Sequence, residues 1–521
     1  RPRRAPPPFG STVLFLLACF VLSLLAMPNL TACSTEEWDE VLPGFSRPPN
    51  SSQTSDLRFN PAPLRDYETA MRRQVDRGII PGYCSAVVLR DRVLHVDTYG
   101  FRDVARGLPM RTDTIVRLFC MTKAVVATGL MVLVEREICA LDDDVAAYIP
   151  ALGAAAIAAA ESDGGRGGKI TLRRLLTHTA GLGYGKEFNL RPESAAEHLY
   201  APLVNAVASG EVDTIDEFCR RLAALPLPEP PGVRFEYSHG LDIIGRVIEV
   251  ASGQPLDRFL EEQLFRPLGM TDTGFAVPEE KLERLAILYG SADTARALGQ
   301  KPRVARGKPA HALVPIDGRR PCDSAWAEGR HCKVLSGGGL MGHNSGGLVS
   351  TLNDQLRFFL MLARGGQAPG GARVLQERTV REMVGRNWLP ECTGQPQHLG
   401  EGVAGVVADG PFGWNALGEL GVVADPAQIK PDGYELGEYG YAGIAETFWT
   451  VNPRRDLVTL WFTQQVDNFS WTEPVANLWI ASRTALGPVP RPPPAATPRA
   501  RSRSPARGRR RIVGKCRPAR G

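Results

Sequence analysis

The sequence predicts an α/β domain in which both ends of the folded region contribute strands to one sheet, with a helical insertion between them. Near the start, CSAVVLRDRVLHVDTYG places two short apolar stretches on either side of Arg90-Asp91-Arg92, the pattern of a β-hairpin. Near the end, ETFWTVNP and DLVTLWFTQQ have strand composition and are joined by a turn at 453–455. The segments between have mainly helical patterns. Strands at both ends with helices between them favour this architecture.

Each helical segment carries its own signals. A polar helix is expected at about 64–78, and a final helix near 472–485. AVVATGLMVLVERE has apolar residues nearly all round, which predicts a buried helix that starts near Cys120. ITLRRLLTHTAGL begins at a cap-like Thr171 and ends at Gly181. FEYSHGLDIIGRVIEVASG is expected to form a second apolar helix, and a Gly-rich loop leads into the amphipathic LVSTLNDQLRFFLMLARGG.

Composition narrows the class of protein. The 521 residues are 43% hydrophobic and 22% charged, as in ordinary globular proteins, which excludes collagens, coiled coils, small disulfide scaffolds, wholly disordered chains and polytopic membrane proteins. The formal net charge is +5, but residues 487–521 hold eleven Lys and Arg and no Asp or Glu. The basic character therefore belongs to the ends of the chain, and the folded region is acidic.

The two ends differ from the folded region at 61–486. Residues 1–33 combine an arginine-rich start with an apolar run, which is typical of an export signal or signal-anchor, and Leu-Thr-Ala-Cys ending at Cys33 is similar to a lipobox. We therefore expect an exported or membrane-anchored protein, with a lipoprotein or a plain apolar leader as alternatives. Residues 34–60 form a linker. Residues 487–521 are expected to be a disordered Pro/Arg/Ser tail that either contacts a polyanion or is simply solvated.

Neither cysteines nor histidines indicate a metal site. The ten Cys form no CxxC pair and no metal-ligand spacing, and the eight His are dispersed. Cys322 and Cys332 could close a small disulfide loop or remain free thiols. The run Asp142-Asp143-Asp144 is expected to be a solvated turn. We therefore predict no metal and no cofactor.

Five segments in order resemble the β-lactamase-related serine hydrolases, which comprise class C β-lactamases, D-Ala-D-Ala carboxypeptidases and esterase relatives. The segments are PMRTDTIVRLFCMTKAVVATGLMVLVE, ITLRRLLTHTAGLGYG, GVRFEYSHGLDIIGRVIEVASGQPLDRFLEEQLFRPLGMTDTGF, GGLVSTLNDQLRFFLMLARGG and GEYGYAGIAETFWTVNP. The resemblance implies the β-lactamase/penicillin-binding fold, an antiparallel sheet flanked by helices plus an all-helical subdomain. By this resemblance, residues of about 61–117 and 400–486 would form the sheet, and residues of about 118–340 would form the helical part.

The active-site motifs depart from the family's pattern in three places. The Ser-x-x-Lys motif is Cys120-Met121-Thr122-Lys123, so the nucleophile position holds a thiol. The Tyr-x-Asn motif is Tyr237-Ser238-His239. The third motif, Lys/His/Trp-x-Gly, is Tyr441-Ala442-Gly443. The lysine, the first tyrosine and the last glycine are therefore retained.

By resemblance, Lys123 and Tyr237 would form the base pair, and the backbone N–H groups of Cys120 and Ile444 would form the oxyanion hole. Backbone donors survive a change of side chain. A thiolate is stabilised at a helix N-terminus and beside lysine, so Cys120 is a reasonable nucleophile. The alternative is that Cys120 is an inert small residue, because sulfur shifts the point of attack in a site shaped for oxygen.

Two other substitutions leave alternatives open. His239 could activate Cys120 as a Cys–His pair, or it could merely replace one polar spacer with another. Tyr441 and Ala442 supply neither the cation nor the small hydroxyl that holds a substrate carboxylate in penicillin-recognising members. An aromatic residue there matches the esterase relatives, although Tyr441 could simply pack beside Tyr439.

Two functions follow from these motifs. The first is an esterase-like hydrolase that acts on a small-molecule ester or amide through an acyl-enzyme on Cys120. The second is a catalytically inactive family member, a pseudoenzyme, that binds a ligand or partner in the same cleft. Membrane contact is expected only through the N-terminal segment.

Overall fold

The computed structural model describes residues 59–90, 92–162, 168–184, 196–208, 211–297, 313–316, 336–338, 340–341, 345–394, 412–418, 420–422, 435–466 and 472–487. All described helices and strands belong to one unit, Arg1–Gly487, and Pro488–Gly521 forms a second unit. The predicted leader and cysteine pair lie outside the described residues, as do the predicted linker except residues 59–60 and the predicted tail except residue 487.

An eight-stranded antiparallel sheet forms the centre of the fold, in the order β10-β11-β12-β13-β14-β1-β2-β3. Its strands are β1 (Gly82–Leu89), β2 (Arg92–Asp103), β3 (Leu108–Pro109), β10 (Phe412–Trp414), β11 (Leu420–Val422), β12 (Tyr439–Gly443), β13 (Thr447–Asn452) and β14 (Leu457–Phe462).

The two ends of the folded region meet in the middle of this sheet. Strand β1 pairs with β14 from Cys84↔Phe462 to Leu89↔Leu457. The predicted hairpin forms β1 and β2, and the two predicted C-terminal strands form β13 and β14. The prediction that one sheet is built from both ends is therefore confirmed.

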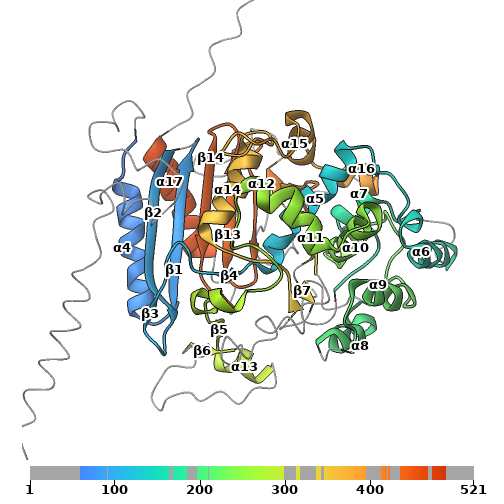
Figure 1. Ribbon diagram of the computed structural model, residues 1–521, viewed down its shortest axis with the longest axis horizontal. Helices are drawn as coiled ribbons and strands as arrows, with labels where there is room; N and C mark the ends of the chain where they lie inside the picture. Colours follow the sequence, from blue (N-terminus) through green and yellow to red (C-terminus); the bar gives the residue numbers. More distant parts are fainter. Residues whose placement is uncertain are drawn as a thin grey trace, which may run out of the picture. The chain divides into compact units, whose positions relative to one another are not determined.

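Two helices from opposite ends of the chain cover one face of the sheet: α4 (Ala62–Asp76) and α17 (Thr472–Leu486) (Figure 1). Because side chains alternate along a strand, Tyr83 and Val87 of β1 point into this layer. They pack in one buried cluster with Leu64 of α4 and Leu478 of α17, among others.

The opposite face carries the main core. Alternate β1 residues, Cys84, Ala86 and Val88, pack in one large cluster with the helices of the insertion. The buried helix α5 (Thr122–Glu135) has apolar residues on all sides, as its sequence predicts. Helix α14 (Leu352–Ala363) lies against β13 and β14 (Figure 1).

The remaining helices are η1 (Phe119–Met121), η2 (Val145–Ala147), α6 (Pro150–Ser162), α7 (Leu172–Leu176), α8 (Ala196–Ala208), α9 (Ile215–Ala223), α10 (Gly240–Ser252), α11 (Leu256–Leu260), η4 (Glu261–Phe265), α12 (Arg266–Leu268), η5 (Glu279–Arg284), α13 (Ala292–Ala297), α15 (Glu377–Val384) and α16 (Leu389–Thr393). The remaining strands are β4 (Val116–Arg117), β5 (Tyr289–Gly290), β6 (Val314–Pro315), β7 (Leu340–Met341), β8 (Ser345–Gly346), β9 (Val349–Ser350) and β15 (Gln465–Val466).

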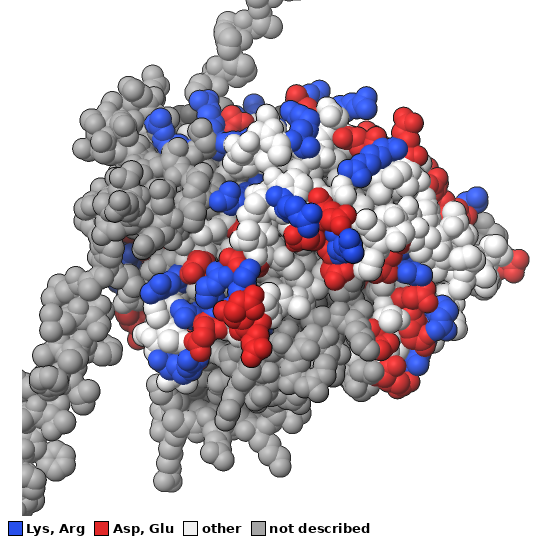
Figure 2. Space-filling view, viewed as in Figure 1, with Lys and Arg blue, Asp and Glu red and all other residues white. Residues whose placement is uncertain are grey.

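The described surface mixes charges of both signs. Lys and Arg side chains lie next to Asp and Glu side chains across the visible face (Figure 2). Within the described ranges, no helix has both the length and the apolar character that a bilayer-spanning segment needs.

A buried carboxylate ties α4 to the sheet. Asp97 of β2 is 3% exposed and accepts hydrogen bonds from the Arg72 guanidinium, at 2.7 Å, and from the Tyr83 hydroxyl. Losing this acceptor costs more than losing an exposed hydrogen bond, because the buried Tyr83 hydroxyl would remain out of water without its partner.

We expect Asp97→Ala to lower the free energy of unfolding by about 2–3 kcal/mol, since Arg72 and Tyr83 lose their common acceptor. Urea denaturation followed by circular dichroism measures this change. The control is Asp66→Ala, at an exposed position on α4, which should change the free energy of unfolding by less than about 0.5 kcal/mol. Equal effects of the two substitutions would contradict the structural role of Asp97.

Candidate active site

Cys120 lies in the short turn η1, directly before α5, where the sequence predicts the helix to begin. The preceding residue, Phe119, is buried and has a φ of 48°, in the left-handed region that bulky residues avoid. Neighbouring hydrogen bonds hold the chain there: Leu118 N donates to Leu348 O at 2.9 Å, and Arg117 N donates to Gln464 Oε1 at 2.9 Å. Backbone strain imposed by surrounding structure is a feature of functional sites.

The Cys120 side chain packs apart from the main core. Its neighbours Met121 and Ala124 belong to the main core cluster, whereas Cys120 belongs to a separate cluster that contains several aromatic residues. That cluster includes Phe119, Tyr184, Tyr237, Leu389, Trp414 and Ala445, with Phe235, Tyr441 and Ile444 packed against it. Cys120 therefore faces the side of the fold where the other predicted site residues gather.

Lys123, one turn after Cys120, is fully buried, and its ammonium has a defined environment. Its Nζ donates a hydrogen bond to the backbone carbonyl of Gly338 at 2.5 Å. The same atom lies 4.7 Å from the centre of the Tyr237 ring and 5.7 Å from that of the Tyr184 ring. Both distances suit attraction between a cation and an aromatic face. The structure therefore brings the predicted lysine and tyrosine together.

Tyr237 does not lie in a helix. The sequence predicts one helix through 235–253, but α10 begins only at Gly240. The reason is that His178 holds the preceding segment in place: Glu236 N donates to His178 O at 2.8 Å, and Ser238 N donates to His178 Nδ1 at 3.2 Å. These two bonds fix the backbone on both sides of Tyr237.

The His178 ring must be neutral to serve in this way, because its Nδ1 accepts the hydrogen bond from Ser238 N. Burial, with the nearby positive charge of Lys123, holds the pKa of His178 well below its ordinary value. The ring also packs against Tyr237, with ring centres 4.6 Å apart. His178 thus supports the segment that carries Tyr237.

His239 turns toward α10. Its Nδ1 lies 2.8 Å from Asp242 Oδ2, and its ring packs against Tyr184 and Phe218. The other ring nitrogen, Nε2, is buried and makes no hydrogen bond in the described part of the chain. His239 is therefore not hydrogen-bonded to Cys120 in this conformation, and its proposed role as a base stays a prediction.

The third motif lies on β12, beside the turn η1 that holds Cys120. A side chain on Gly443 would come within 2.2 Å of Leu118 O, so only glycine allows this close approach of the two backbones. The approach brings Ile444 into the same cluster as Cys120. The ring centre of Tyr441 lies 6.2 Å from that of Tyr237 and 5.7 Å from that of Trp414.

Sequence patterns alone did not single out three of the aromatic residues at this site. Tyr184 and Trp414 come from separate segments and pack against Tyr237, and Phe235 packs against Trp414. Burial and the nearby negative charge of Asp242 raise the pKa of Tyr184 well above its usual range, so its hydroxyl stays protonated. Asp242 did carry a signal, since it is an acidic residue with apolar neighbours on both sides, Leu241 and Ile243.

A second group of side chains has the order of a hydrolase triad but lacks access. Ser85 Oγ lies 3.1 Å from His95 Nε2, and His95 Nδ1 lies 3.2 Å from Glu68 Oε1. Ser85 is fully buried between the sheet and α4. This group therefore satisfies polar atoms in the packed interface.

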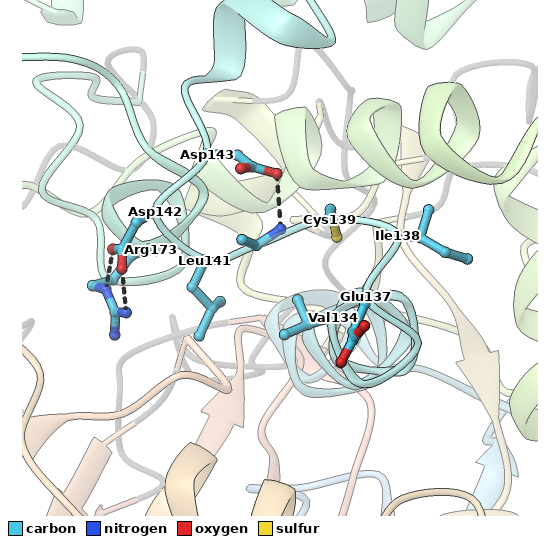
Figure 3. Close-up of a pocket in the computed structure, with 9 residues that line it drawn as sticks. Val134, Glu137, Ile138, Cys139, Leu141, Asp142, Asp143 and Arg173 are labelled. Atoms are coloured by element: carbon cyan, nitrogen blue, oxygen red, sulfur yellow. Dashed lines mark hydrogen bonds and ion pairs between the residues drawn. The ribbon is translucent and has the colours of Figure 1, made fainter.

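The pocket of about 430 Å³ in Figure 3 lies at the other end of α5 from Cys120. Its lining includes Cys139 and the first two residues of the Asp142–144 run. Asp142 pairs with Arg173, and Asp143 accepts a hydrogen bond from Ala140 N. Asp144 caps η2 through Ala146 N. The run is therefore a turn, as predicted, and no group of three or more His, Cys, Asp and Glu side chains gathers as a metal site among the described residues.

Comparison with known proteins finds related sequences and related folds. The sequence profile of the family described as Beta-lactamase matches residues 68–479. Protein Rv1367c of Mycobacterium tuberculosis is 31% identical over 412 residues, covering 77% of this chain and 90% of its own. Esterase EstB of Burkholderia gladioli is 35% identical over 208 residues, covering 40% of this chain and 50% of its own.

Among solved structures, this chain resembles EstCE1, described as a hydrolase with promiscuous acyltransferase activity. The TM-score is 0.59 at 22% identity, and the match covers 81% of this chain and 98% of that one. This likeness confirms the predicted fold, an antiparallel sheet flanked by helices with a helical subdomain. Together with the profile that covers most of the folded region, it identifies the chain as a member of the β-lactamase family.

Proposed function

We propose that this protein cleaves carboxylic esters through a thioester formed on Cys120. The observation that carries the proposal is the placement of Lys123 Nζ, 4.7 Å from the Tyr237 ring centre, one turn from a cysteine in a strained turn. A nucleophile, a proton acceptor and an oxyanion site are the elements that acyl transfer needs.

In the first half-reaction, Cys120 Sγ attacks the ester carbonyl carbon as a thiolate, paired with the Lys123 ammonium. The backbone N–H groups of Cys120 and Ile444 hold the negative oxygen of the tetrahedral intermediate. The carbon–oxygen bond to the alcohol then breaks, and the departing alcohol takes up a proton from the Lys123 ammonium, assisted by Tyr237, which leaves Lys123 as a neutral amine. The acyl group remains on sulfur as a thioester.

In the second half-reaction, water attacks the thioester, loses a proton to the same base and releases the carboxylic acid. An alcohol in place of water would yield a new ester. EstB is named an esterase, and EstCE1 is described as a hydrolase with promiscuous acyltransferase activity. These descriptions support both outcomes for the family. Hydrolysis and acyl transfer share the thioester, so both depend on Cys120.

The surroundings of the site favour an uncharged, apolar acyl group. Phe235, Trp414 and Tyr441 contribute aromatic faces. Tyr441 and Ala442 offer no positive charge to a substrate carboxylate where penicillin-recognising relatives place a lysine and a hydroxyl. Short-chain and aromatic esters are therefore better candidates than β-lactams.

The nucleophile is tested with p-nitrophenyl butyrate. We expect Cys120→Ala to reduce turnover by at least about 1000-fold, since the step that forms the thioester is lost. Peptide mass spectrometry of the quenched wild-type reaction should find the butyryl group on Cys120. Cys219→Ala, at a buried cysteine in α9, is the control and should retain activity.

Two outcomes of the same assay would contradict the proposal. Activity that appears only in Cys120→Ser would identify a serine enzyme inactivated by its cysteine. No turnover by either form, with an ester analogue still bound, would identify the pseudoenzyme, a binding protein that uses the same cleft.

The base is tested with Lys123→Met, which keeps the length of the side chain and removes its charge and donors. We expect kcat to fall by about 100-fold or more. The melting temperature should change little, because removing a buried charge also removes its desolvation cost. Lys169→Met, at a lysine paired with Asp144 on the surface, should leave kcat unchanged. An unaltered kcat in Lys123→Met would exclude this lysine as the base.

Substrate preference is tested by comparing kcat/KM for p-nitrophenyl butyrate and for the cephalosporin nitrocefin. The ester should be preferred by about 100-fold or more, since the nitrocefin carboxylate finds no cation at position 441. Tyr441→Ala should lower kcat/KM for the ester by about tenfold through lost apolar contact. Equal use of both substrates would contradict the ester preference.

A further inference from the structure

Asp242 is a buried carboxylate that the proposed chemistry does not use. It lies in the first turn of α10 and is fully buried. Its Oδ1 accepts hydrogen bonds from Ser336 Oγ and from Gly338 N, both at 2.7 Å. Its Oδ2 lies 2.8 Å from His239 Nδ1. A charge in this position needs a full set of partners to offset its desolvation, and the helix N-terminus adds to its stabilisation.

One of these partners leads directly to the site. Gly338 donates its N–H to Asp242, and its carbonyl accepts the hydrogen bond from Lys123 Nζ. The residue is thus fixed on one side by the carboxylate and on the other by the ammonium. A continuous chain of hydrogen bonds runs from His239 through Asp242 and Gly338 to Lys123.

The glycine-rich segment is packed too closely for any other residue. A side chain at Gly337 would lie 2.2 Å from Leu241 O, and one at Gly338 would lie 2.7 Å from Asp242 Oδ2. Glycine permits this approach but gives the backbone little conformational preference of its own. The position of the Gly338 carbonyl must therefore come from the contacts of this residue. Asp242 supplies the charged acceptor for its N–H.

We propose that Asp242 is a positioning residue that fixes the Gly338 carbonyl, and through it the ammonium of Lys123 beside Cys120. His239 orients the carboxylate through its Nδ1. This role of His239, in place of direct action on sulfur, accounts for the histidine where the family has asparagine. The inference rests on the proposed function only for the role of Lys123, because the bonds themselves belong to the fold.

The test measures how fast iodoacetamide alkylates Cys120, followed by peptide mass spectrometry across a range of pH. This rate reports the thiolate and does not require turnover. In Asp242→Ala we expect the rate at neutral pH to fall by about tenfold, since misplacing a neighbouring group by a fraction of an ångström has effects of this size. Asp242→Asn keeps an oxygen for Gly338 N and should stay within about threefold of wild type.

Three comparisons separate positioning from general loss of stability. Asp97→Ala removes a buried carboxylate on the other face of the sheet and should leave the Cys120 rate within about twofold of wild type. Adding Asp242→Ala to Lys123→Met should change the rate by less than about twofold, because the two act in series. His239→Ala should have a smaller effect than Asp242→Ala. If Asp242→Ala does not fold, Ser336→Ala, which removes one bond to the same oxygen, should lower the rate by about threefold.

A wild-type alkylation profile in folded Asp242→Ala would overturn the proposal. So would equal losses in Asp242→Asn and Asp242→Ala, which would mean that charge acts rather than position. A larger loss in His239→Ala than in Asp242→Ala would instead assign His239 a direct role on Cys120. If the expected pattern is found while wild type fails to hydrolyse any ester, the positioning role stands and the proposed function fails.

Discussion

The buried ammonium of Lys123 is the constraint on which the rest of the site depends. Taking an ammonium group out of water is costly unless the interior supplies partners for it. Those partners are the Gly338 carbonyl and the rings of Tyr237 and Tyr184. They come from three segments that are far apart in the chain, so the favourable placement of one charge requires all three to be in place.

The turn that holds Cys120 is likewise held by segments that are distant in the chain. The backbone N–H of Leu118 donates a hydrogen bond to the Leu348 carbonyl, and that of Arg117 donates one to the Gln464 side chain. Gly443 lies directly against the Leu118 carbonyl. These contacts hold the unusual backbone of Phe119, which no local preference would select. Cys120 is therefore presented only when the sheet, built from both ends of the chain, is complete.

The departures from the family's motifs have different structural consequences. The thiol at position 120 keeps the place of the family's nucleophile at the start of α5. His239 pairs with Asp242 through its Nδ1. The buried Ser85 and His95, with the partly exposed Glu68, show that the order of groups does not by itself make a catalytic site, because a substrate must also reach the nucleophile. Location at the junction of sheet and helices thus matters as much as residue type.

The sequence alone determined the strands of the central hairpins and the buried helix after Cys120, because these depend on local periodicity. The residues of the three motifs came from the resemblance of the sequence to the family. The sequence also placed Tyr237 inside a helix, since the apolar pattern continues through 235–253, but hydrogen bonds to His178 end the helix at Gly240. Only the tertiary structure decided that Gly338 and Tyr184 are partners of Lys123 and that Asp242 is the partner of His239. The first two are contacts between segments far apart in the chain and the third is a choice between competing buried partners, and neither kind leaves a periodic trace in the sequence.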